Sequence, residues 1–329
     1  MKAVVTGGAG FIGSHLVENL LAANYEVLVI DNFSTGSKNN VGVFQGQVEI
    51  ITHDICTKFP TNIFRGCSVV FHLAALADIV PSIERPIDYM ATNVQGTVNV
   101  LEAARESGVD RIIYAASSTC YGIAKEFPTN EKHPNHPMFP YALSKYLGEL
   151  VFFHWLELYG LKGLSLRLFN VYGPRARTTG NYGAVMGVFL AQKIAKQPYT
   201  VVGDGTQSRD FTYVSDVIRA FLTAGESSLS GEAINIGTQN PQSINRLVQL
   251  LGGTVEFIPK RPGEPDKTHA DISKARNLLK WEPKVDFEQG ISEVLDQIEL
   301  WKDAPVWNRA QINKATSTWF KFLRTHENN

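Results

Sequence analysis

A short apolar strand that runs into a cluster of glycines constrains the fold of this chain more than any other feature. The chain begins MKAVVTGGAGFIG, with glycines at Gly7, Gly8, Gly10 and Gly13, and a helix is expected from Ser14. Glycine lets the backbone turn tightly, approach a pyrophosphate and pack closely against the following helix. The N-terminus of that helix adds free N–H groups and the positive end of its dipole. The pattern predicts a phosphate-binding turn between the first strand and the first helix.

The second strand, expected over Glu26–Asp31, ends in an acid. A carboxylate at this place accepts hydrogen bonds from both hydroxyls of a ribose and repels a 2′-phosphate, so Asp31 favours NAD over NADP. A glycine turn alone is weak evidence, because such turns also occur without a ligand. Here strand, glycines, helix, second strand and acid follow one another in the order of a dinucleotide-binding unit. The sequence therefore predicts NAD as the cofactor.

The alternation of strands and helices in the first half predicts an α/β protein with a doubly wound parallel sheet of the Rossmann type. The expected strands are nearly continuous apolar runs, which is typical of a sheet covered by helices on both faces. These strands are Ala3–Thr6, Glu26–Asp31, Val48–Thr52, Ser68–Leu73, Arg111–Ala115 and Gly163–Leu168. The expected helices between them are Ser14–Ala23, Gln95–Ser107 and Tyr141–Tyr159.

After Asn170 the alternation weakens, and the loops lengthen at 172–183, 203–210 and 260–271. A smaller C-terminal substrate lobe is expected over the carboxyl ends of the strands, where open sheets bind ligands. The expected units are an NAD-binding domain at 1–170, with a returning segment near 210–237 that includes a strand at Ala233–Gly237, and a lobe from 171–209 and 238–329. The last stretch, 301–329, is expected to be an amphipathic helix against the body, with no assigned role.

The composition excludes several classes of protein. The chain has 329 residues and a net charge of −1, so it can bury two lobes and has no excess charge for nucleic acid or anionic membrane. No apolar run reaches the roughly 18 residues of a transmembrane helix. Cys56, Cys67 and Cys120 have no metal-binding spacing and fit a reduced cytosol, and Met1 leads directly into a strand, without room for a signal peptide. We expect a soluble cytoplasmic protein without a metal.

Tyr141 and Lys145 are four residues apart, so on a helix they project from one face. The spacing is common by chance, but here it opens a helix after a hydroxyl-rich strand end. Lowering the pKa of a tyrosine from about 10 by about three units takes about 4 kcal/mol of preferential stabilisation of the phenolate. Lys145 and a positive nicotinamide ring would supply it, which makes Tyr141 the expected base. Ser117 would bond the reacting sugar hydroxyl.

Together these residues resemble extended short-chain dehydrogenases/reductases, and more narrowly nucleotide-sugar epimerases of the UDP-glucose and UDP-N-acetylglucosamine 4-epimerase kind. The resemblance rests on TGGAGFIG at 6–13, HLAA at 72–75, Ser117-Ser118, the Tyr141/Lys145 pair and LRLFNVYGP at 166–174, and it spans about 1–298. It implies inversion at C4 of a nucleotide sugar. The base takes the proton of the 4-hydroxyl while NAD takes the hydride, and the 4-keto sugar rotates before the hydride returns.

The resemblance also implies roles for individual residues. The implied cofactor contacts are Gly7, Gly10, Phe11, Ile12, Gly13, Asp31, Asn32, Asp54, Ile55, Leu73, Ala74, Ala75, Asn93, Tyr141 and Lys145. The implied substrate contacts are Ser117, Ser118, Asn170, Arg209, Arg261, Glu264 and Thr268. Arg209 and Arg261 would hold the diphosphate, for which guanidinium forks are well suited.

Three departures from the family pattern bear on the reaction. Dehydratases carry Thr-Asp-Glu where this chain has Ser117-Ser118-Thr119, and decarboxylases carry a Glu at the place of Thr119, so both reactions are disfavoured. Thr268 falls where glucose-restricted epimerases carry a Tyr, and its small side chain leaves room for a 2-acetamido group. Ala77 replaces a family lysine near the nicotinamide, which weakens the expectation that the cofactor is retained.

The sequence leaves two alternative functions open, and it favours a second copy of the chain as a partner. Another nucleotide-sugar epimerase or reductase of the family would act on a uronate or on a CDP-, GDP- or dTDP-sugar. A catalytically silent NAD-binding sensor is disfavoured by the presence of Tyr141 and Lys145. The resemblance implies a homodimer through a four-helix bundle of Gln95–Ser107 and Tyr141–Tyr159 from each copy. The apolar surface of the second helix favours such a partner, unless the C-terminal segment covers it.

Overall fold

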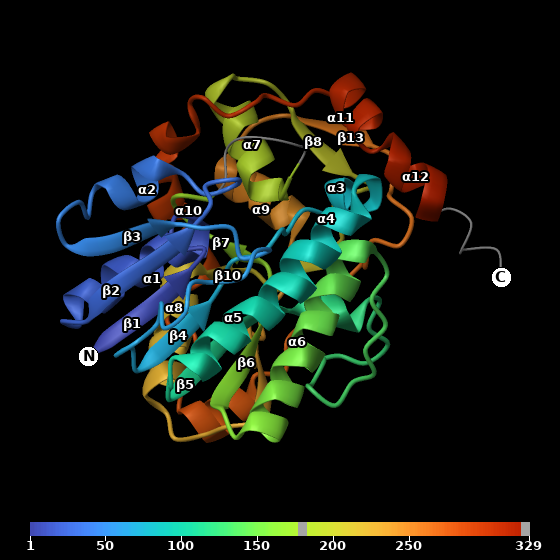
Figure 1. Cartoon of the computed structure of the whole chain (residues 1–329). Helices are drawn as coiled ribbons and strands as arrows, with labels where there is room; N and C mark the ends of the chain where they lie inside the picture. Colours follow the sequence, from blue (N-terminus) through green and yellow to red (C-terminus); the bar gives the residue numbers. More distant parts are fainter. Residues whose placement is uncertain (177–182, 324–329) are drawn as a thin grey trace.

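A sheet of seven parallel strands forms the centre of the computed structural model, which describes residues 1–176 and 183–323 (Figure 1). The order across the sheet is β11-β6-β5-β4-β1-β2-β3, so it reverses next to β1, as in a doubly wound Rossmann-type sheet. The strands are β1 (Lys2–Thr6), β2 (Glu26–Asp31), β3 (Val48–Thr52), β4 (Val69–His72), β5 (Arg111–Ser117), β6 (Lys162–Leu168) and β11 (Glu232–Ile236). The predicted sheet is confirmed, including the late strand. Parts of the expected loop 172–183 and of the tail lie outside the described residues.

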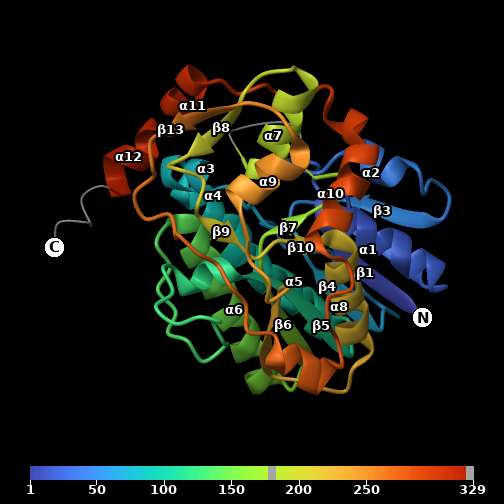
Figure 2. The same ribbon diagram turned by 180° about the vertical axis from the view of Figure 1, so that it is seen from behind.

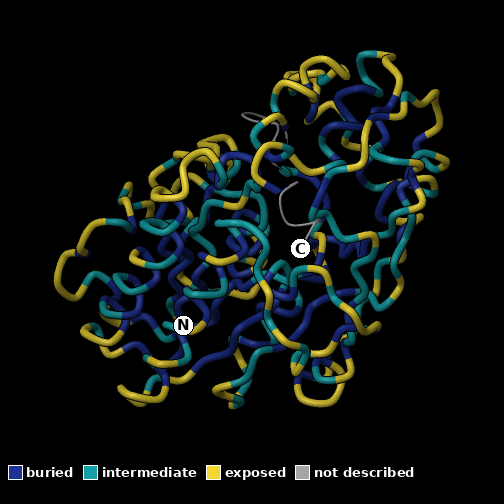
Figure 3. The backbone as a smooth tube through the Cα atoms, turned by 90° about the vertical axis from the view of Figure 1, so that its right-hand side faces the viewer, coloured by how far each residue is buried: buried dark blue, intermediate teal, exposed yellow. Residues whose placement is uncertain are grey.

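Helices cover both faces of the sheet, which is why most residues of its inner strands β1, β4 and β5 are buried. Val5 belongs to one core cluster with Leu16 of α1 (Phe11–Ala22), and Val4 belongs to a second cluster with Leu101 of α5 (Gly96–Glu106). Neighbouring residues of one strand therefore serve opposite cores. The interior is buried, and exposed residues gather on the outer turns (Figure 3).

The predicted helices are present with shifted boundaries. α1 begins at Phe11 rather than Ser14, because Gly10 is extended and caps the helix. α5 follows a π-helical turn, η1 (Ala91–Gln95), and lies beside α6 (Pro140–Tyr159) on the same face (Figure 1). Shorter elements of this half are α2 (Lys38–Gly42), α3 (Ile79–Glu84), α4 (Pro86–Met90) and the 3-10 turn η2 (Ser118–Tyr121). α8 (Val214–Glu226) packs against α1 on the opposite face.

Most of the remaining elements lie beyond the carboxyl ends of the strands (Figures 1 and 2). They include pairs of short strands, which the sequence does not predict. The pairs are β8 (Tyr199–Val202) with β13 (Val255–Ile258), β9 (Ser208–Arg209) with β12 (Gln242–Ser243), and β7 (Val171–Tyr172) with β10 (Thr212–Tyr213). The helical segments here are α7 (Val185–Ile194), α9 (Ile244–Leu251) and α10 (Phe287–Asp296), whereas η3 (Ala275–Leu279) packs on α8 and β11.

The expected single helix over the C-terminal stretch is wrong. The described part of this stretch follows the 3-10 turn η4 (Ile298–Trp301) and holds two short helices, α11 (Arg309–Ala315) and α12 (Ser317–Leu323). Asn308 starts α11 with a capping box to Gln311, and Pro305 stands in the link before it. A proline cannot continue a helix and a capping box begins a new one, so the chain divides here. None of the described helices combines the length and apolarity needed to span a membrane.

Candidate active site

A cavity of about 690 Å³ joins the glycine turn to the elements above the sheet. Its lining includes Gly7 and Asp31 at one end, Tyr141 in the middle, and Arg209 and Arg261 at the other. These residues come from segments far apart in the sequence. They meet because parallel strands all present their carboxyl ends at one edge of the sheet.

The glycine turn leaves no room for side chains. A Cβ at Gly13 would lie 2.1 Å from the carbonyl oxygen of Gly7, and a Cβ at Gly7 would lie 2.7 Å from the backbone nitrogen of Ala74. Gly7 also has a φ of +71°, which other residues rarely adopt. The start of α1 therefore meets the cavity as bare backbone, the arrangement that binds a pyrophosphate. These residues fit the diphosphate of NAD.

Asp31 is held at the tip of β2 by two backbone amides. Its carboxylate accepts hydrogen bonds from the N–H of Ala9 at 2.9 Å and of Phe33 at 2.8 Å. Burial raises the pKa of Asp31, and the two amide bonds oppose that rise. Since each carboxylate oxygen has a second lone pair and the residue lines the cavity, Asp31 can still accept bonds from ribose hydroxyls.

Most of the predicted cofactor residues line the cavity, and three do not. The lining residues are Gly7, Gly10, Phe11, Ile12, Gly13, Asp31, Asn32, Ile55, Leu73, Ala74, Ala75 and Tyr141. The other three are Asp54, Asn93 and Lys145. Asp54 is exposed. Its carboxylate accepts a hydrogen bond from the backbone N–H of Cys56 at 2.9 Å, and this bond lowers the pKa of Asp54.

Asn93 holds the loop that follows β4. Its side-chain oxygen accepts from the backbone N–H of Leu76 at 2.8 Å, and its NH₂ donates to the Leu76 carbonyl at 2.9 Å and to Ser144 at 2.9 Å. Leu76 and its neighbours Leu73 to Ala77 line the cavity. Asn93 therefore acts on the cavity through this loop rather than by direct contact.

His72 continues this network, and its neighbours determine its tautomer. Thr97 donates to the Asn93 carbonyl at 2.7 Å, so its oxygen accepts from Nε2–H of His72 at 3.0 Å. Nδ1 of His72 then accepts from the Thr6 hydroxyl at 2.7 Å, while that hydroxyl oxygen accepts from the N–H of Ala74. The ring is neutral, and burial lowers the pKa of His72 to about 3. In the sequence, the HLAA motif at 72–75 is the only pattern that indicates this network.

Tyr141 and Ser117 meet where α6 begins above the end of β5. The Tyr141 hydroxyl donates to Oγ of Ser117 at 3.4 Å, and Ser117 also bonds the Thr119 hydroxyl at 2.9 Å. Ser118 and Thr119 line the cavity, whereas Ser117 does not. Burial raises the pKa of Tyr141, the Ser117 bond lowers it, and the nearby carboxylate of Asp78 raises it. This net direction is opposite to the lowered value expected from the sequence, because burial outweighs the hydrogen bond.

Lys145 lies one turn further along α6, in the interior. Its ammonium is 4.4 Å from the ring centroid of Tyr114, and burial lowers its pKa to about 7 while the Glu149 carboxylate opposes that shift. The hydroxyl of Tyr114 donates to the backbone oxygen of Lys145 at 3.2 Å. Lys145 therefore carries only part of its positive charge near neutral pH.

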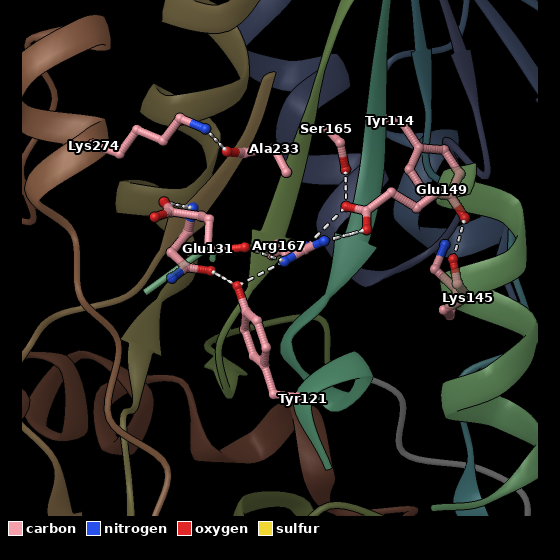
Figure 4. A network of polar contacts seen from close by, with 10 residues as sticks. Tyr114, Tyr121, Glu131, Lys145, Glu149, Ser165, Arg167, Ala233 and Lys274 are labelled. Carbon is pink, nitrogen blue, oxygen red and sulfur yellow. Dashed lines mark hydrogen bonds and ion pairs between the residues drawn. The ribbon is translucent and has the colours of Figure 1, made fainter. Parts of the chain in front are cut away.

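Behind Lys145 lies a buried ion pair that the sequence reading missed (Figure 4). Glu149 pairs with Arg167 at 2.7 Å and accepts from Ser165 at 2.6 Å. Arg167 also donates to the Tyr121 hydroxyl at 2.9 Å, and that hydroxyl donates to Asn235 of β11 at 2.7 Å. The network ties α6 to β6, η2 and β11. Its signal in the sequence is an acid, Glu149, one turn after Lys145 on a mostly apolar helix.

The predicted substrate residues above the sheet come together at the far end of the cavity. Arg209 bonds the Glu264 carboxylate at 2.9 Å, and Arg261 lies 3.6 Å from the other oxygen of Glu264. Thr268 donates to the side-chain oxygen of Asn170 at 2.9 Å and accepts from the N–H of Asp210 at 2.9 Å. Asn170 and Thr268 also line the cavity, as do Asp78, Trp307 and Trp319, none of which was predicted at the site from the sequence.

The fold and the site define a NAD-dependent short-chain dehydrogenase/reductase. The model of the NAD dependent epimerase/dehydratase family matches residues 3–237, and the chain belongs to this family. It is 38% identical over 302 residues to a putative UDP-glucose 4-epimerase of Methanocaldococcus jannaschii, covering 89% of this chain and 97% of that relative. It is also 33% identical over 307 residues to UDP-glucuronic acid decarboxylase 1 of Xenopus tropicalis, covering 89% of this chain and 71% of that relative.

Solved structures give the same class. UDP-glucose 4-epimerase of Thermotoga maritima, with UDP-glucose, superposes with a TM-score of 0.85 at 35% identity, covering 92% of this chain and 99% of that one. UDP-N-acetylglucosamine 4-epimerase of Methanobrevibacter ruminantium superposes with a TM-score of 0.85 at 33% identity, covering 91% of this chain and 97% of that one. UDP-glucuronic acid 4-epimerase of Bacillus cereus, with UDP-glucuronic acid and NAD, superposes with a TM-score of 0.84 at 34% identity, covering 91% of this chain and 99% of that one. NAD is the cofactor of this class.

Proposed function

We propose that this protein inverts C4 of a UDP-sugar, interconverting UDP-glucose with UDP-galactose or their N-acetylated forms through a transient 4-keto sugar. The observation that carries the proposal is the Tyr141 hydroxyl, 3.4 Å from Ser117 and placed in one cavity between a pyrophosphate cradle and two arginines. A hydroxyl base between a dinucleotide end and a diphosphate end suits oxidation of a sugar carbinol carbon. Bound NAD supplies that reversible oxidation.

Tyr141 removes the proton from the reacting sugar hydroxyl, and Ser117 orients both groups. Because burial raises the pKa of Tyr141, its phenolate needs positive charge nearby during the reaction. Lys145 is one turn away, and its pKa of about 7 allows it to gain a proton when a negative charge forms beside it. The two residues together would act as the base.

Inversion requires the sugar to present both faces to one base. Arg209 and Arg261 would grip the diphosphate by charge-assisted hydrogen bonds. Thr268 is small and already bonded to Asn170 and Asp210, so it leaves space beside the sugar. A tightly held nucleotide with a loosely held sugar allows rotation of the keto form about its diphosphate.

Decarboxylases occur among the relatives, and the residues after β5 argue against that reaction here. Ser117, Ser118 and Thr119 carry hydroxyls only, and the Thr119 hydroxyl is bonded to Ser117. The segment offers no carboxylate to remove the C5 proton or to assist loss of water. The carboxylates in the cavity lining come from other elements, such as Asp78 before α3 and Glu264 beside the arginines.

The test is an NMR assay of C4 configuration with purified protein and no added cofactor. UDP-glucose, UDP-N-acetylglucosamine and UDP-glucuronate are supplied separately, since structural neighbours act on each of these sugars by name. We expect interconversion of the glucose and galactose forms of at least one of the first two. Turnover of UDP-glucuronate alone, or loss of its carboxyl group, would contradict the proposal. If turnover needs added NAD, the cofactor is bound but not retained.

We also propose a division into a cofactor half, 1–170 with 210–237, and a substrate half, 171–209 with 238–329, between which the cavity lies. Limited proteolysis with and without NAD tests this division. NAD is expected to protect the first half selectively. Equal protection of both halves would argue for one undivided unit.

A homodimer through α5 and α6 remains a proposal, and its support is an exposed apolar row on α6. Leu143, Leu150 and Leu158 are 38%, 46% and 60% exposed and lie at helical spacing. Within the described residues the C-terminal segment packs on α3 rather than on α6, so the alternative cover suggested by the sequence is wrong. Light scattering should show a dimer, and Leu150→Glu should yield a folded monomer. A wild-type monomer would refute this proposal.

A further inference from the structure

The C-terminal elements reach into the cavity, although the function proposed above gives them no part. Ala304, Pro305, Trp307 and Trp319 all belong to its lining. The family match ends at residue 237, and the match to the Methanocaldococcus relative covers 97% of that protein but only 89% of this chain. The chain thus carries residues outside that match, and some of its cavity wall comes from its end.

Trp319 of α12 is fastened to the loop that carries Arg261. It is 4% exposed, and its Nε1–H donates to the carbonyl of Pro262 at 2.7 Å. The guanidinium of Arg261 lies 5.6 Å from the centroid of the indole ring, within range of a cation–π contact. The indole N–H is therefore already used, and the ring offers a ligand contact area without a hydrogen-bond donor.

The other side of α12 rests on the sheet half. Trp319 and Leu323 form a buried cluster with Val80 of α3, and Thr318 donates to the Glu84 carboxylate at 3.3 Å. Figures 1 and 2 both show α12 beside α3. α12 thus joins an element next to the cofactor loop to the loop of Arg261, and it closes that end of the cavity.

A row of aromatic rings leads from Trp319 to the proposed base. The rings of Tyr141 and Phe139 are 6.4 Å apart and nearly parallel at 11°, and those of Phe139 and Trp319 are 6.3 Å apart. Met138, Phe139 and Trp319 line the cavity between Tyr141 and Arg261. A sugar whose 4-hydroxyl is at Tyr141 and whose diphosphate is at Arg261 must lie along this apolar wall.

We infer that Trp319 is a specificity-determining residue of the sugar subsite, and that it favours UDP-sugars with an acyl substituent over unsubstituted hexoses. The inference rests on the proposed function and deepens it. An apolar wall without a free donor gains contact area from an acetamido methyl group, whereas it strips water from a hydroxyl without replacing the lost hydrogen bond. Thr268 differs from Trp319 because its small side chain only leaves room for the larger substituent and does not favour it.

The test compares Trp319→Ala, Trp319→Phe and Phe322→Ala. Phe322 lies on the same helix, is 52% exposed and is not in the cavity lining, so it is the matched control. For Trp319→Ala we expect KM for UDP-N-acetylglucosamine to rise about tenfold and KM for UDP-glucose about threefold at most, with kcat and UDP affinity nearly unchanged. Trp319→Phe should recover most of the loss, and Phe322→Ala should match the wild type.

Binding calorimetry separates this inference from the proposed function. If the wild type epimerises but Trp319→Ala changes neither sugar, the inference fails and the function stands. If Trp319→Ala weakens UDP and both UDP-sugars equally, Trp319 only supports Arg261, and the inference also fails. If the wild type turns over no sugar, yet Trp319→Ala weakens UDP-N-acetylglucosamine and not UDP, the wall is supported and the function is refuted. If Trp319→Ala does not fold, Trp319→Leu replaces it, because leucine fills part of the site but removes the flat ring; the same selective rise in KM for UDP-N-acetylglucosamine is expected, and no change for either sugar would refute the inference.

Discussion

The two sides of the cavity are built in different ways. On the sheet side, Gly7, Asp31 and Ser117 stand at the carboxyl ends of β1, β2 and β5, so backbone ladders set their positions. On the opposite side, Arg209 lies in a two-residue strand and Arg261 in a loop. Their positions depend on side-chain contacts such as the 2.9 Å pair of Arg209 with Glu264.

This difference predicts how each side responds to substitution. A ladder of backbone hydrogen bonds survives the loss of one side chain, so a change on the sheet side should act on one property, either chemistry or stability. A site held by side-chain pairs loses its geometry with either partner. The predictions that follow test this contrast, beginning with the largest effect.

Tyr141→Phe should reduce turnover by about 10²- to 10⁴-fold, the usual contribution of a positioned acid–base group. NAD content and UDP affinity should stay at wild-type values, because the backbone cradle and the arginines are untouched. Turnover is measured by NMR and binding by calorimetry. Tyr159→Phe, at the exposed end of the same helix, is the control. A variant within about tenfold of the wild type would remove Tyr141 from the base role.

Arg167→Met should destabilise the protein by about 3–5 kcal/mol, because it leaves the Glu149 carboxylate buried without its partner. The ion pair is 6% and 2% exposed at its two side chains. Arg105→Met breaks a pair with Glu102 whose side chains are about one third exposed, and we expect a much smaller loss of stability because solvent screens this pair. Urea unfolding measures both. Equal losses would mean that the network of Figure 4 contributes no more than a surface pair.

Arg209→Ala should weaken UDP about 10- to 100-fold, since it removes a charged contact and leaves Glu264 facing the diphosphate. NAD affinity should not change, because the cradle is built by the sheet side. Calorimetry with UDP and with NAD measures the two. Arg276→Ala, a half-exposed arginine that is not in the cavity lining, should leave both affinities intact. Loss of NAD binding in Arg209→Ala would show that the two sides are not independent.

His72→Gln should flatten the pH dependence of stability. The folded pKa of His72, about 3, lies below its unfolded value of about 6.5. Its contribution is therefore fully present above pH 6.5 and is lost as the pH falls toward 3. Between pH 7 and pH 5 this loss amounts to about 2 kcal/mol. Urea unfolding at both pH values should show a drop smaller by about that amount in the variant. The same drop in both proteins would show that His72 is protonated in the fold.

The sequence was most informative about residues whose surroundings are determined by a single strand, turn or helix. The parallel sheet, its late strand, the glycine cradle and the place of Asp31 were all predicted, because their pattern is local and repeats with a known period. Asn93 and the Glu149–Arg167 pair were not understood from the sequence. Their partners are 17 and 18 residues away, and pairing over such a separation leaves no periodic signal.

By itself, the sequence determined a NAD-binding parallel sheet and predicted a tyrosine base at its edge, since strand propensity, glycine freedom and helical spacing act over a few residues. The tertiary structure alone decided which charges are buried and what closes the cavity. It raised the pKa of Tyr141 by burial, and it brought Trp319, close to the end of the chain, beside Phe139 and Arg261. Burial and long-range contact depend on how all the elements pack together, and that packing exists only in the folded chain.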